Sequence, residues 1–180
     1  MKGGAGAAGV KAGPCENINI QDNTVYHAHG GFVIGSEFSG GMKNIVVRNN
    51  TFQGTDAGLR FKSAVKRGGK SENIYIDHIY MTDITGDAIT FETTYFDNHV
   101  GAKQQVAPGK QEFLPDFQDI HISNVYVRGC KNGIVAHGAE GMIHDITIKD
   151  CNIFYNKNAK DIDAACKITL ENVNFSTFAK

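Results

Sequence analysis

The chain has 180 residues, a formal net charge of −1 and 41% hydrophobic residues. This size suits one domain with a sizeable core, and the near-zero charge excludes the strongly basic surface that is typical of nucleic-acid binding. The sequence contains no apolar stretch of the length that a membrane span requires.

The first residues, 1–14, are rich in glycine and alanine. We expect a leader loop or a partial coil there. The segment also lacks the long aliphatic run of a secretory signal. It therefore carries no marker of a cellular compartment.

Six short units with one hydrophobic pattern follow along the chain. Their first isoleucines are Ile18, Ile45, Ile74, Ile120, Ile146 and Ile168, and the first five are separated by 27, 29, 46 and 26 residues. Each unit is apolar again two residues later, which is the period of a strand. Repeated β-branched runs, punctuated by Gly, Asn and Asp, favour a right-handed parallel β-helix, an all-β fold, over a helical solenoid.

Each coil contains a second predicted strand, in residues 31–34, 58–61, 88–91 and 133–136. Alternation places two columns of residues outward on these strands. The first column is Val33, Arg60, Thr90 and Val135, and the second is Gly35, Lys62, Glu92 and His137. The longer interval contains residues 96–117, which we predict to be a surface loop inserted in a single domain of residues 1–180.

The four cysteines, Cys15, Cys130, Cys151 and Cys166, do not have the spacing of a zinc site, and we expect no metal or cofactor. Cys151 lies in an inward column, which favours a buried thiol over a disulfide. Six of the seven histidines show no ligand spacing; the exception considered further is His29.

Two motifs in register resemble those of a known family. Residues 28–37 read A-H-G-G-F-V-I-G-S-E, S-G-G follows at 39–41, and L-R-F-K stands at 59–62. This pattern resembles the family 28 glycoside hydrolases, the polygalacturonases, whose motifs are G-H-G and R-I-K. The S-E-x-S-G-G continuation is similar to that of bacterial exo-acting members. The resemblance implies hydrolysis of α-1,4-galacturonosidic bonds in polygalacturonate (pectin) with inversion, and a secreted or periplasmic parent protein.

The resemblance also implies roles for single residues. His29 would belong to the catalytic site and orient its acid and base, while Arg60 and Lys62 would bind a galacturonate carboxylate. Tyr95 matches a substrate-contacting tyrosine, and Glu37 would border a subsite of exo-acting enzymes. Without the family context, Arg60 and Lys62 would read as a solvated face, His29 as a turn residue and Glu37 as a surface charge.

The N-T-D and D-D motifs that supply the family's catalytic carboxyls do not occur in this sequence. An inverting glycosidase needs two carboxyls about 6.5–9.5 Å apart. We therefore expect a fragment from the latter part of a polygalacturonase, inactive alone, in which Met1 stacks on Ile34. Asp56 stacks on His29 by register, but we do not expect it to be the catalytic carboxylate.

Two other functions remain open. A non-catalytic β-helix that binds acidic polysaccharides would need only Arg60 and Lys62. A pectate lyase ranks last, because that chemistry uses calcium held by clustered carboxylates and no outward acidic column is present. The expected partner is a pectic polysaccharide or oligogalacturonide, not a nucleic acid or a membrane. Self-association through an uncapped first coil is also expected.

Overall fold

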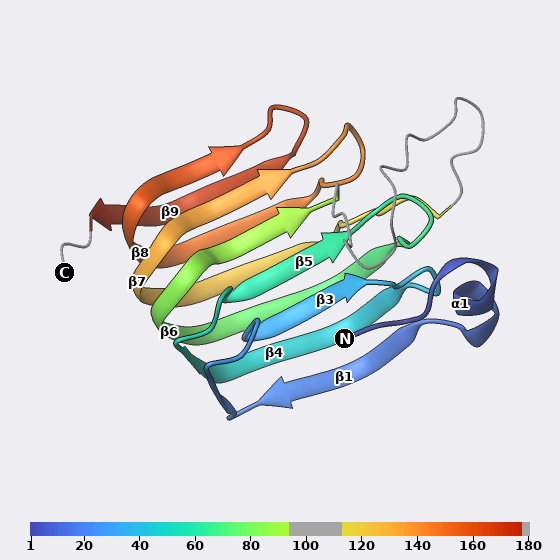
Figure 1. Cartoon of the computed structure of the whole chain (residues 1–180), viewed down its shortest axis with the longest axis horizontal. Coiled ribbons are helices and arrows are strands. Elements are labelled where there is room, and N and C mark those ends of the chain that lie inside the picture. Colours follow the sequence, from blue (N-terminus) through green and yellow to red (C-terminus); the bar gives the residue numbers. More distant parts are fainter. Residues whose placement is uncertain (94–112, 178–180) are drawn as a thin grey trace.

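The computed structural model describes residues 1–93 and 113–177. These residues form one short helix and nine strands, arranged as a stack of coils (Figure 1). The elements are α1 (Gly6–Ala12), β1 (Cys15–Gln21), β2 (Thr24–Tyr26), β3 (Phe32–Ser36), β4 (Met42–Gln53), β5 (Leu59–Ser63), β6 (Ser71–Glu92), β7 (Ile120–His137), β8 (Ile146–Ile162) and β9 (Ile168–Thr177). Among the described residues, no helix is long and apolar enough to cross a membrane.

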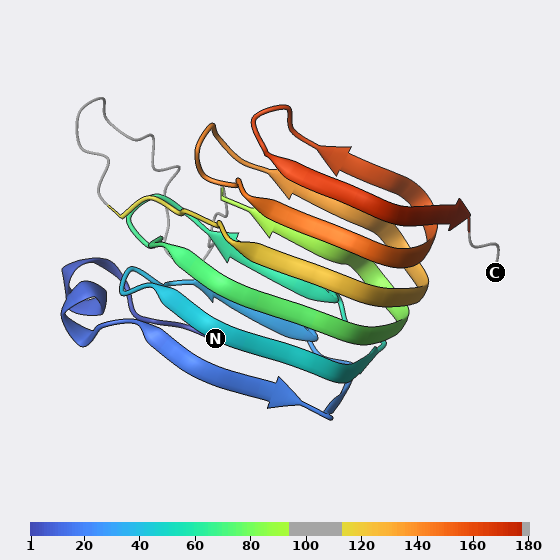
Figure 2. The ribbon, with the colours of Figure 1, turned by 180° about the vertical axis from the view of Figure 1, so that it is seen from behind.

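The strands pair in parallel in the order β1-β4-β6-β7-β8-β9, and β3, β5 and β6 form a second run of parallel pairs. The predicted column of isoleucines is confirmed, because each one is paired with the next along the stack. The fold is the right-handed parallel β-helix that the repeat predicts. Figure 2 shows the same stack from behind, with the long strands bending from one face of the coil to the next.

The bends in the long strands coincide with residues in the left-handed region of backbone space. One such residue directly precedes the inner position of the second face in each of six coils, with φ between 51° and 58°. They are Asp22, Asn49, His78, Asn124, Asp150 and Asn172. Asn, Asp and His tolerate this conformation better than other side chains do. The sequence therefore sets where each strand turns its corner.

The core is a set of stacked apolar columns inside the coils. Phe61 and Phe91 stack at 4.4 Å between ring centroids with an interplanar angle of 6°. Phe117 is fully buried and packs edge-on against both rings. The prediction of a surface loop over residues 96–117 therefore does not extend to Phe117, and residues 96–112 lie outside the described part. Cys151 is a buried free thiol, as predicted.

The first residues are more regular than a leader loop. Residues 6–12 form helix α1, and Met1 lies beside β3. Its amino group donates a hydrogen bond to the carbonyl of Val33, and its carbonyl accepts one of 2.9 Å from the backbone N–H of Gly35. These two bonds place Met1 against Ile34, as predicted from the register.

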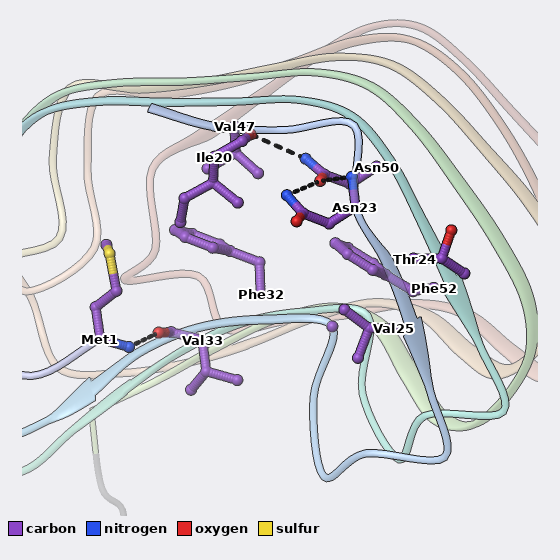
Figure 3. Close-up of a pocket in the computed structure, with 11 residues that line it drawn as sticks. Met1, Ile20, Asn23, Thr24, Val25, Phe32, Val33, Val47, Asn50 and Phe52 are labelled. Atoms are coloured by element: carbon purple, nitrogen blue, oxygen red, sulfur yellow. Dashed lines mark hydrogen bonds between the residues drawn. The ribbon is translucent and has the colours of Figure 1, made fainter. Parts of the chain in front are cut away.

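The first coil borders a hollow of about 360 Å³ (Figure 3). Its lining includes Ile20, Val25, Phe32 and Phe52, together with Asn23 and Asn50. Ile20 and Val25 are half-buried, whereas their counterparts in the next coil, Val47 and Phe52, are buried. The interior of the β-helix is thus open at this end of the described residues.

Candidate functional site

The two outward columns have the register that the sequence predicts. Val33, Arg60, Thr90 and Val135 are successive partners, as are Gly35, Lys62, Glu92 and His137. On β5 the half-buried Arg60 and Lys62 alternate with buried residues, so both cations lie on one face. Thr90 and Val135, which follow Arg60 in the first column, are buried although they point outward. Solvent therefore hardly reaches this column in the two coils after that of Arg60.

His29 joins Arg60 through a short chain of polar contacts. His29 Nδ1 lies 2.8 Å from Asp56 Oδ2, and Arg60 Nη1 lies 2.7 Å from His29 Nε2. The side chains of His29 and Asp56 are 69% and 61% exposed, whereas that of Arg60 is only 16% exposed. The structure therefore brings together His29 and Arg60, as the resemblance implied, and adds Asp56 to them.

Two further polar side chains contact this cluster, one at Asp56 and one at Arg60. The hydroxyl of Thr85 donates to Asp56 Oδ1 at 3.3 Å, and Glu92 Oε2 lies 4.0 Å from Arg60 Nη2. The hydrogen bond from His29 is the main cause that lowers the pKa of the Asp56 carboxyl, and the bond from Thr85 adds to it. A carboxyl with a lowered pKa is ionised at neutral pH and is unsuited to donate a proton to a leaving group. The lowered pKa therefore argues against Asp56 as the catalytic acid.

The remaining predicted residues lie elsewhere or outside the described part. Glu37 is one residue beyond β3, and its carboxylate lies 3.7 Å from Lys2 Nζ. The contacts therefore place Glu37 beside the first residues of the chain. Tyr95 falls in residues 94–112, outside the described residues. The described residues contain no group of three or more His, Cys, Asp or Glu that could hold a metal ion.

Sequence reasoning did not assign a role to Thr85 or Glu92. Both could have been found by counting along the coils, because Thr85 follows Asp56 by 29 residues and Glu92 is the predicted outward neighbour of Lys62. A polar residue at a matching position one coil away is the signal for such contacts in a β-helix.

Comparisons with known proteins agree with this geometry. The sequence profile of the glycosyl hydrolases family 28 matches residues 6–172. A polygalacturonase from Ralstonia solanacearum is 31% identical over 132 residues, which cover 71% of this chain and 22% of that protein. An exo-poly-alpha-D-galacturonosidase from Dickeya chrysanthemi is 31% identical over 130 residues, which cover 69% of this chain and 20% of that protein.

A solved structure extends the likeness to three dimensions. The crystal structure of a hyperthermoactive exopolygalacturonase from Thermotoga maritima matches with a TM-score of 0.83 and 31% identity. The match covers 97% of this chain and 38% of that one. The chain thus spans only a fifth to two fifths of the length of these relatives.

Proposed function

The chain belongs to the glycosyl hydrolases family 28, and from this premise we propose that it carries the substrate-binding part of a site that hydrolyses polygalacturonate. The reaction of the whole protein would be the hydrolysis of α-1,4-galacturonosidic bonds with inversion. The observation that supports this is the pair of cations on one face of β5, with Arg60 in contact with His29. The N-T-D and D-D motifs are absent from these 180 residues, so the chain alone is expected to be inactive.

The two cations suit a galacturonate carboxylate in different ways. Arg60 offers a planar fork of N–H donors that can bind both carboxylate oxygens, while Lys62 supplies a compact positive charge. Glu92 and His29 already contact Arg60, so a ligand must compete with them for its donors. We therefore expect weak binding of a single galacturonate and stronger binding of an oligomer, which can engage both cations at once.

Binding and turnover are tested separately. Titration calorimetry with trigalacturonate should show binding that falls at least tenfold in an Arg60→Gln, Lys62→Gln double variant. Arg48→Gln is the matched control, because Arg48 lies on β4 and contacts Gln21 at 2.9 Å, away from the proposed site. Equal affinities for the two variants would refute the proposed site.

Turnover is measured as the release of reducing sugar from polygalacturonate. We expect none above a control without protein. Release that disappears in a His29→Ala variant would show that the chain holds a complete catalytic site and would contradict the expected inactivity.

A non-catalytic polysaccharide-binding β-helix is the alternative, favoured by the absence of the aspartate motifs from the sequence. Binding without turnover is expected for both functions. The source DNA next to the Met1 codon distinguishes them: an in-frame extension that encodes D-D and N-T-D favours the hydrolase. A stop codon and ribosome-binding site there favour the binding protein.

We also propose that the chain self-associates through its first coil, and that the parent protein is secreted or periplasmic, as the resemblance implies. The half-buried Ile20 and Val25 at the open hollow support self-association (Figure 3). Light scattering should report oligomers that an Ile20→Lys variant disperses. A monodisperse monomer of the unaltered chain would contradict this part of the proposal.

A further inference from the structure

The contact between Arg60 and His29 determines where the imidazole carries its proton. A guanidinium has only donors, so His29 Nε2, 2.7 Å from Arg60 Nη1, must accept. The imidazole is then neutral at Nε2, and its proton is on Nδ1. From Nδ1 it is donated to Asp56 Oδ2 at 2.8 Å. The three side chains thus form one directed chain, from Arg60 through His29 to Asp56.

Hydrogen bonds hold both the backbone and the carboxylate of Asp56 in place, so that it can fix the proton of His29. Its backbone N–H donates to the carbonyl of Ala28 at 2.9 Å, and its own carbonyl accepts from Gly86 at 2.9 Å. Thr85 donates to the carboxylate oxygen that His29 does not use. Two neighbouring coils therefore position both the backbone and the carboxylate of Asp56, although its side chain is mostly exposed.

We propose that Asp56 is a positioning residue that keeps His29 in the Nδ1-protonated tautomer and presents Nε2 as an acceptor on the face of Arg60. The lowered pKa of Asp56 agrees with this, because the carboxylate stays ionised and remains an acceptor. The competing arrangement is a protonated imidazole in a surface ion pair with Asp56. It would turn an N–H of His29 toward the Arg60 donor, which the observed geometry opposes.

Ligand binding would change the hydrogen bond at the Arg60 end of this series of three side chains. This step rests on the proposed function. A galacturonate carboxylate that takes the Nη1 donor of Arg60 removes the hydrogen bond to His29 Nε2, while Asp56 keeps the proton on Nδ1. Binding then leaves an unprotonated nitrogen beside the bound sugar. His29 would become available to accept a proton or a hydroxyl hydrogen bond only when the carboxylate is in place.

The tautomer is measured by long-range ¹H–¹⁵N correlation spectra of the whole chain with ¹⁵N-labelled histidine, at about pH 8, where an ordinary histidine is neutral. The signals of His29 are assigned from a His29→Gln variant. We expect Nδ1 to resonate as a protonated nitrogen and Nε2 as an unprotonated one. An Nε2-protonated or doubly protonated ring in the unaltered chain would overturn the proposal.

Variants separate positioning from a general effect on structure. Asp56→Ala should shift His29 toward the Nε2-protonated form, whereas Asp56→Asn keeps an acceptor oxygen and should retain the Nδ1 proton. Asp161→Ala is the matched control, because Asp161 lies 3.5 Å from His137 Nε2 and should affect that ring alone. An unchanged His29 spectrum in a folded Asp56→Ala variant would refute the role of Asp56.

Added trigalacturonate tests the coupling to the ligand. We expect the Nε2 signal of His29 to move as its bond from Arg60 is lost, with Nδ1 still protonated. Bound trigalacturonate that leaves the Nε2 signal in place would overturn the coupling. A chain with the expected tautomer that binds no trigalacturonate would refute the proposed function and leave the role of Asp56 intact.

Discussion

Asn50 offers a direct test of what holds the first two coils together. Its side chain is 1% exposed, and its amide uses every bonding direction. Nδ2 donates to the carbonyls of Ile20 at 3.0 Å and Arg48 at 2.9 Å, and Oδ1 accepts from the backbone and side-chain N–H groups of Asn23, both at 3.0 Å. Figure 3 shows three of these four bonds as the link between the coils. Asn50→Ala removes all of them without changing the backbone.

The expected loss follows from those contacts. A typical hydrogen bond contributes about 1 kcal/mol net, and a buried group left without a partner costs about 1–3 kcal/mol. The exposed Asn23 amide can bind water instead, so its loss is small. The Ile20 and Arg48 carbonyls and the Asn23 backbone N–H account for most of the effect. We expect about 2–4 kcal/mol.

Urea denaturation followed by circular dichroism measures this loss. If the free energy of unfolding falls by about 2 kcal/mol per M urea, the urea concentration at the unfolding midpoint should fall by about 1–2 M. Asn152→Ala is the matched control, because Asn152 is exposed and accepts a hydrogen bond of 3.3 Å from the side-chain amide of Asn174. A change at such a surface site is worth about 0.5 kcal/mol or less. A midpoint shift in Asn50→Ala no larger than in this control would refute the reasoning.

Three further predictions concern the core and the strand that carries the cations. Phe61→Ala should lower the free energy of unfolding by about 3–5 kcal/mol, since the ring is fully buried and stacked; a loss under about 1 kcal/mol in urea denaturation would contradict this. Burial raises the pKa of the Cys130 thiol to about 12, so a disulfide reagent at about pH 8 should modify the half-buried Cys15 first and reach Cys130 only after unfolding; equal rates for the two thiols in the native chain would refute it. Gly35→Ala should lower the midpoint temperature of thermal unfolding more than Gly141→Ala does. Both glycines have positive φ, but a Cβ at Gly35 would lie 1.8 Å from a carbonyl oxygen of β5, whereas a Cβ at Gly141 would have no atom within 4 Å among the described residues. Equal losses would show that backbone conformation alone matters there.

The sequence predicted the stacking register because burial imposes it. A slip of one residue would turn every inward isoleucine outward, so a pattern of apolar residues at i and i+2 has only one stable alignment. The sequence also contains an Asn, Asp or His before each inner position of the second face. These residues form the corners because of the backbone conformation that they tolerate, not because of burial. Asn49 and Asn124, for example, have φ of 53°. Hydrophobic periodicity alone carries no signal for them.

Helix α1 was missed for a different reason. Its seven residues include two glycines, Gly6 and Gly9, and its N-cap residue, Ala5, makes no side-chain capping hydrogen bond. An isolated helix of this length and composition is not stable. Contacts from the rest of the chain support it: the backbone N–H of Gly6 donates to Ser39 Oγ at 2.9 Å, and the helix ends at Gly13 with φ of 83°. Such support from residues far along the sequence cannot be read from local propensity.

The same distinction applies within the candidate site. Asp56 and His29 meet because they occupy matching positions in adjacent coils, so register alone predicted the pair. Arg60 is different: its backbone partner in that coil is Val33, yet its guanidinium contacts His29, four residues earlier. A long side chain is placed by the polar groups within its reach, which here are the acceptor nitrogen of His29 and the carboxylate of Glu92. Removing the negative charge in Glu92→Gln should therefore free Arg60 for a ligand and strengthen trigalacturonate binding, whereas the register of β5 and β6 stays the same. Weaker binding in that variant would mean that Glu92 orients Arg60 rather than competing for it.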